Sequence, residues 1–102
     1  MKIAVTAILF ASSLASSYTL ATEKLAQSSG CMGCHSIERK IVGPGFKEVS
    51  QKYQSNKTAA SNLINKVKSG GSGVWGPVPM PPNPHVKDED VKAIVQWILA
   101  LK

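Results

Sequence analysis

The pentapeptide CMGCH, residues 31–35, holds the side chains of this sequence that are best suited to bind a cofactor: Cys31, Cys34 and His35. The chain has no other cysteine. Two thiols separated by two residues match the spacing of the two vinyl groups of haem, to which they can add as thioethers. The next residue then lies beneath the iron, where its imidazole can coordinate. The motif therefore predicts one haem c, attached through Cys31 and Cys34, with His35 as an axial ligand.

Three other uses of this motif fit the sequence less well. A thioredoxin-like redox pair occurs beside a βαβ pattern, which this chain does not show. A structural zinc site needs four ligands, and the distant His85 would complete only an irregular set. A disulfide between Cys31 and Cys34 would close a very small loop and would stabilise the fold little.

The second axial ligand is predicted to be Met80, within the segment WGPVPMPPNP at residues 75–84. A thioether sulfur is a weak ligand that favours ferrous iron, so His/Met ligation raises the reduction potential. The prolines around Met80 restrict the free loop, so little conformational freedom is lost on ligation. Ordinary core packing is the alternative for Met80. Met32 lies between the two cysteines and cannot reach the far face of the haem, and the rival ligand His85 is expected at the surface.

The elements that must position these residues are predicted to be helices. Apolar periodicity and Gly or Pro residues at the segment ends predict helices near residues 22–29, 46–53, 58–69 and 88–101. Thr22 is expected to cap the first helix and Gly30 to end it. No alternating strand pattern is present, so the chain is expected to be all-α with irregular connections at 40–46 and 70–87. Connections this long in so small a chain indicate that they surround a bulky group.

The N-terminal region has the pattern of a secretory signal peptide. Lys2 is followed by the apolar run Ile3–Ala11 and then by small and hydroxyl residues. We expect residues 1–21 to be cleaved after Ala21, with Ala15 as a second candidate site, which leaves 22–102 as a monohaem domain. The apolar run is about half of the roughly 20 residues that a membrane-spanning helix needs. Membrane insertion is therefore not expected, and an uncleaved anchor is the alternative.

The charge of the chain favours acidic partners. Lysine and arginine number 12 against 6 acidic residues, giving a formal net charge of +6. The basic residues are dispersed, with no run of five or more, so a nucleic-acid-binding tail is not indicated. Dispersed basic charge is typical of a solvated surface that attracts acidic proteins.

The motifs CMGCH, IVGPGF and GVWGPVPMPPN, followed by a C-terminal helix with Trp97, closely resemble the small bacterial class I cytochromes c of the c-551 (c-552) type. The resemblance covers essentially all of residues 22–102. It implies a compact all-α fold of about four short helices wrapped around one covalently bound haem. It also implies a monomeric, periplasmic electron carrier. The segment around Pro84 and His85 is slightly longer here than in that family.

The resemblance also implies roles for residues around the haem. The carbonyl of Pro44 would accept a hydrogen bond from the His35 ring, and Asn83 would hydrogen-bond the sulfur of Met80. Trp75 would donate its indole N–H to a haem propionate, with core packing as the alternative. Lys66 falls where the family often has arginine and would contact a propionate as a point donor. For Trp97 we expect core packing.

These residues together predict a one-electron carrier rather than an enzyme. Two protein ligands leave the iron no open position for a substrate. By resemblance, the partners are redox proteins with acidic docking surfaces: a cytochrome bc1-type, quinol-oxidising donor and a terminal oxidase or nitrite reductase as acceptor. The first alternative is a haem-based sensor or peroxidase-like enzyme with a labile sixth ligand. The second is an electron-transfer module of a larger complex.

Overall fold

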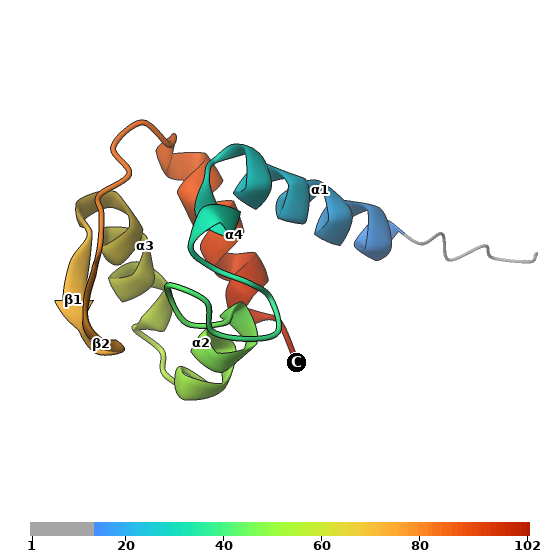
Figure 1. Cartoon of the computed structure of the whole chain (residues 1–102). Coiled ribbons are helices and arrows are strands. Elements are labelled where there is room, and N and C mark those ends of the chain that lie inside the picture. The colour runs from blue at the N-terminus through green and yellow to red at the C-terminus, as the bar shows by residue number, and fades with distance from the viewer. Residues whose placement is uncertain (1–13) are drawn as a thin grey trace, which may run out of the picture.

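Four α-helices and one short β-hairpin make up the part of the chain that this computed structural model describes, residues 14–102, with side chains from residue 20 on. Figure 1 shows the helices surrounding α4, with the hairpin on the far side of α3. The elements in chain order are α1 (Leu14–Ser28), the 3-10 turn η1 (Cys31–Gly33), α2 (Phe46–Lys52), α3 (Ala59–Ser69), β1 (Gly71–Gly73), β2 (Gly76–Met80) and α4 (Asp88–Leu99).

The first helix begins earlier than the sequence predicted. It starts at Leu14, so Thr22 lies inside the helix, 4% exposed, and the prediction that Thr22 caps it was wrong. Residues 14–21 contain neither glycine nor proline, so nothing there interrupts the helix. Gly30 follows α1 with a φ of 88°, the left-handed conformation that commonly ends a helix. Of the predicted signal peptide, residues 1–13 lie outside the described part; the cleavage site stays a prediction and falls within α1.

Helix α4 provides the central surface against which α1, α2 and α3 all pack. Its apolar stripe is buried as predicted, at Val91, Ile94, Val95 and Ile98. The acidic residues 88–90 occupy its first turn, where the helix dipole favours negative charge. Trp97 is 6% exposed and meets Phe46 edge-on, with ring centroids 5.7 Å apart, so core packing of Trp97 is confirmed. From residue 14 on, no helix combines the length and apolarity needed to cross a membrane.

The connection 70–87 was predicted to be irregular throughout. This prediction was wrong in part, because the connection contains the antiparallel hairpin β1–β2. Gly71 pairs with Met80 and Gly73 with Gly76. Pro77 and Pro79 lie next to Gly76 and Met80, the residues of β2 that pair with β1. Neighbouring residues of a strand point their N–H groups in opposite directions, so a proline at these two positions costs the hairpin no hydrogen bond. The sequence gives no alternating signal here because β1 consists only of glycine and serine. The hairpin matters for function because it places Met80 at its end.

Candidate haem site

A cavity of about 310 Å³ lies between the CMGCH segment, the β-hairpin and α4. Its volume falls within the roughly 300–1,000 Å³ that is usual for cofactor and ligand pockets. Its walls are mostly apolar, from α2, α3, the hairpin and α4. Every site residue that the sequence predicted lines this one cavity: Cys31, Cys34, His35, Pro44, Lys66, Trp75, Met80 and Asn83.

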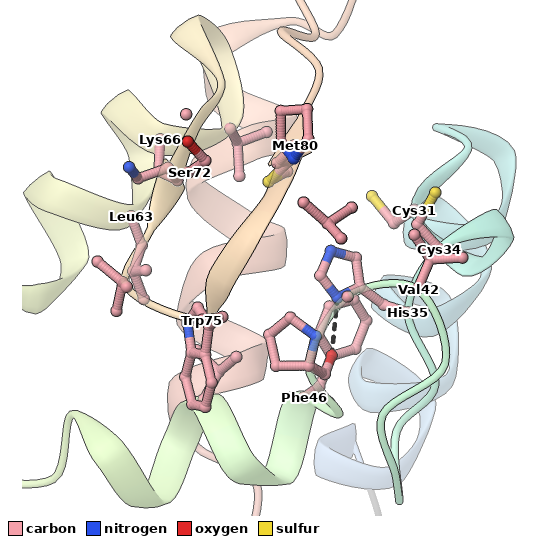
Figure 2. A pocket seen from close by; sticks show the side chains of 18 of the residues that line it. Cys31, Cys34, His35, Val42, Phe46, Leu63, Lys66, Ser72, Trp75 and Met80 are labelled. Atoms are coloured by element: carbon pink, nitrogen blue, oxygen red, sulfur yellow. Dashed lines mark hydrogen bonds between the residues drawn. The ribbon is translucent and has the colours of Figure 1, made fainter.

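The imidazole of His35 is held on three sides. Its Nδ1 donates a hydrogen bond to the carbonyl oxygen of Pro44, 2.8 Å away, the partner that the resemblance implied. The ring stacks on Phe46 with a centroid distance of 4.9 Å and an interplanar angle of 22°. Gly43 lies against the same ring. With the proton on Nδ1, the other ring nitrogen faces the cavity with its lone pair free for a metal (Figure 2).

Met80 lies across the cavity from His35. It is the last residue of β2 and is half-buried, and its sulfur faces the space that the imidazole also faces (Figure 2). A basic imidazole nitrogen and a soft thioether on two sides of an apolar cavity form the donor set of a His/Met haem iron.

The two cysteines lie in and just after η1, at one side of the cavity (Figure 2). The backbone N–H groups of Cys34 and His35 both donate to the carbonyl of Cys31, at 3.3 and 3.1 Å, which closes the turn and brings the three residues together. Burial raises the pKa of the Cys31 thiol, while a hydrogen bond from its backbone opposes that change.

The remaining predicted site residues lie at the hairpin side of the cavity. Lys66 and Leu63 reach it from α3, and Trp75 from the turn between the strands (Figure 2). Trp75 is 38% exposed, and the ammonium of Lys52 lies 5.6 Å from its ring centroid. The side-chain amide of Asn83 donates to the carbonyls of Val67, at 3.2 Å, and Pro81, at 3.1 Å. The propionate contacts of Trp75 and Lys66, and the hydrogen bond from Asn83 to the Met80 sulfur, stay predictions.

The rival ligands lie elsewhere. His85 is exposed on the connection before α4 and does not line the cavity. Met32 packs against the core cluster that includes Phe46 and Trp97. Between Leu14 and Lys102, no three or more His, Cys, Asp and Glu side chains gather to hold a metal ion, so the zinc alternative finds no ligand set there.

Sequence reasoning predicted the bond from His35 to Pro44 but missed the two other residues that hold the His35 ring, Gly43 and Phe46. Phe46 was predicted only as an apolar position of a helix. Ten residues without a regular helix or strand separate it from His35, so no periodicity in the sequence indicates that the two rings stack. A Cβ atom at Gly43 would lie 2.6 Å from Cε1 of His35, so the ring can pack there only against glycine. The motif IVGPGF contains both residues, but spacing alone does not report which side chain they contact.

The residues present fit a covalently attached haem. Cysteines at one side, an imidazole nitrogen below, a thioether above and apolar walls match the chemistry of a c-type haem. No part of this fit depends on residues outside 30–98.

Comparison with known proteins agrees with this fit. Residues 21–102 match the sequence profile of the cytochrome c family. The chain is 47% identical over 89 residues to a cytochrome c-552 of Nitrosomonas europaea, covering 87% of this chain and 86% of that protein. It is 55% identical over 82 residues to a cytochrome c-551 of Allochromatium vinosum, covering 80% and 87%. The crystal structure of Nitrosomonas europaea cytochrome c552 superposes with a TM-score of 0.76 at 49% identity, covering 78% of this chain and 99% of that one.

Proposed function

The chain belongs to the cytochrome c family, and we propose on that basis that it shuttles single electrons between respiratory proteins of the periplasm. The haem c, attached through Cys31 and Cys34, supplies the one-electron couple of ferrous and ferric iron. The protein's own contribution is to supply His35 and Met80 as the proposed ligands, to restrict their movement and to shield them from water.

The observation that carries this proposal is the arrangement of His35 and Met80 across one cavity, with Nδ1 of His35 bonded to Pro44. The Pro44 carbonyl fixes the tautomer and strengthens the ring as a donor. Met80 supplies a neutral sulfur that favours the ferrous state. If His35 and Met80 both held the iron, no position on the metal would be open to a substrate, which supports a carrier rather than an enzyme.

The proposed docking surface is the mouth of the cavity. Val42 and Val78 line the cavity and are nonetheless 53% and 61% exposed. Lys40 lines it as well and is exposed. A small apolar rim with basic charge suits brief contacts with acidic redox proteins, which bury little surface. In this proposal the donor is a cytochrome bc1-type complex and the acceptor a terminal oxidase or nitrite reductase.

Absorption spectra of the purified protein in both redox states test the ligand set. We expect a low-spin c-type spectrum and, in the oxidised protein, a weak red-region band from sulfur-to-iron charge transfer. The reduced protein should not bind carbon monoxide, since Met80 and His35 occupy both positions. Rapid carbon monoxide binding would instead support a haem-based sensor or a peroxidase-like enzyme.

Fractionation of cells tests the rest of the proposal. The protein should be released with the periplasm, begin near residue 22 and elute from gel filtration as a monomer. Elution with a larger assembly would support a module of an enzyme complex.

A further inference from the structure

The end of α3 holds the chain on both sides of Met80. On the side before Met80, β1 follows α3 directly and Gly71 pairs with Met80 itself. Gly70 approaches so closely that a Cβ atom there would lie 2.5 Å from the Met80 carbonyl oxygen. The backbone of Met80 therefore lies against Gly70 and Gly71, the two residues that directly follow the last turn of α3.

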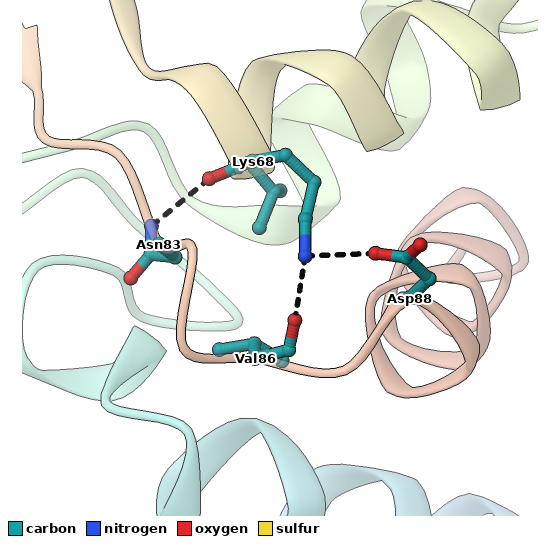
Figure 3. A network of polar contacts seen from close by, with 5 residues as sticks. Lys68, Asn83, Val86 and Asp88 are labelled. Carbon is teal, nitrogen blue, oxygen red and sulfur yellow. Dashed lines mark hydrogen bonds and ion pairs between the residues drawn. The ribbon is translucent and has the colours of Figure 1, made fainter.

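On the side after Met80, the same turn makes two polar attachments (Figure 3). The carbonyl of Val67 accepts hydrogen bonds from the backbone N–H of Asn83, at 3.0 Å, and from its side-chain amide, at 3.2 Å. The ammonium of Lys68 donates to the carbonyl of Val86, at 2.8 Å, and pairs with a carboxylate oxygen of Asp88, at 2.7 Å. Lys68 thus joins the end of α3 to the start of α4.

Lys68 makes its contacts with a charged group, whereas the hydrogen bonds between Asn83 and Val67 join neutral groups. The Lys68 side chain is 29% exposed, whereas Asp88 is 89% exposed, so the bond to the Val86 carbonyl is the better shielded of the two. Val86 is itself 6% exposed and packs with Val91. A charged donor bonded to a half-buried carbonyl makes a stronger hydrogen bond than a neutral one.

The prolines between Met80 and Val86 transmit this attachment. Pro81, Pro82 and Pro84 each fix φ, so the segment cannot easily absorb a displacement of one end by changing its own conformation. The prolines make the segment stiff, and the hydrogen bonds that fix the segment to the rest of the fold come from α3.

We propose that Lys68 is a positioning residue for Met80: it fixes the far end of the stiff segment, and so keeps the weak thioether in place. The proposal rests on the proposed function in one respect, that Met80 is an axial ligand. It extends that function by placing control of the ligand in a side chain outside the cavity.

The test measures how readily the oxidised holoprotein exchanges Met80 for added cyanide. Cyanide can bind only when Met80 leaves, so its apparent affinity reports the population of the ligand-free state. Lys68→Ala should raise cyanide affinity about tenfold, as expected for loss of a charge-assisted hydrogen bond. Lys68→Arg, which keeps a charged donor, should return the affinity to within about threefold of the wild type. Asp88→Asn, which spares the Val86 bond, should have the smaller effect.

Two control variants separate positioning from general destabilisation and from charge. Ser50→Ala removes a hydroxyl that bonds the carbonyls of Leu99 and Leu101, at 3.1 and 2.7 Å, and that does not line the cavity. It should lower the denaturant midpoint without raising cyanide affinity. Lys92→Ala removes one exposed positive charge from α4 and should change neither.

Unchanged cyanide affinity in Lys68→Ala would overturn the proposal. So would an equal rise in Ser50→Ala at the same loss of stability. If the wild-type protein itself lacks the sulfur-to-iron band, then the proposed function fails as well as this inference. If the band is present and Lys68→Ala behaves as wild type, only this inference fails.

Discussion

The imidazole of His35 lies so close to Gly43 that a Cβ atom at position 43 would be 2.6 Å from Cε1 and 2.9 Å from Nδ1 of the ring. The ring cannot move away freely, because Pro44 holds Nδ1 and Phe46 stacks on one face. Gly43, whose side chain is a single hydrogen atom, therefore helps to decide where the imidazole of the predicted ligand His35 lies.

Gly43→Ala should displace the His35 ring and weaken its bond to Pro44. We expect a loss of about 1–3 kcal/mol in the free energy of unfolding, typical of overpacking, together with a changed low-spin spectrum. Denaturant unfolding and absorption spectroscopy measure the two effects. Gly33→Ala is the matched control, because a Cβ atom there meets nothing within 4 Å. If Gly43→Ala had the stability and the spectrum of the wild type, the His35 ring would have to accommodate a methyl group at position 43, and this prediction would be wrong.

Met80→Ala should abolish the red-region charge-transfer band and lower the reduction potential, because the ligand that favours ferrous iron is lost. The reduced variant should then bind carbon monoxide. Met32→Ala removes a methionine that packs against the core outside the cavity and should keep the band. Retention of both band and potential in Met80→Ala would show that another group is the ligand.

Cys31→Ala combined with Cys34→Ala should prevent covalent haem attachment and leave the fold without its central group. The buried apolar residues do not form one continuous core but two clusters, one around Phe46 and Trp97 and one around Val91 and Val95. A domain this small is marginal without a cofactor or cross-link. We expect loss of most far-UV helical signal and of cooperative thermal unfolding. A sharp transition near the wild-type temperature would contradict this.

Lys40→Glu should slow electron exchange with an acidic redox partner, because it reverses a charge at the mouth of the cavity. At low ionic strength we expect a decrease of several-fold to about tenfold in the second-order rate, measured by stopped flow. The difference should shrink at about 0.5 M salt, where the Debye length is only a few Å. Lys92→Glu makes the same charge change on α4, away from the cavity, and should have little effect. Equal slowing by both variants would argue for net charge rather than a local docking surface.

The sequence by itself determined the cofactor and most of the helices, and it predicted the two ligands, His35 and Met80. The motif CMGCH is specific because vinyl spacing and imidazole reach constrain it chemically, and Met80 is marked by the prolines around it. Helix α4 was predictable because its apolar residues recur at the helical period. These signals are local, and each can be recognised within a few turns of chain.

Only the tertiary structure decided how those groups are held. The hairpin β1–β2 had no alternating pattern, since its first strand is Gly-Ser-Gly. The close approach of Gly43 to His35, and the attachment of Lys68 to Val86 and Asp88, join residues that carry no mutual signal along the chain. Such contacts depend on how elements pack, and packing is set by the whole core and not by the period or type of any one segment.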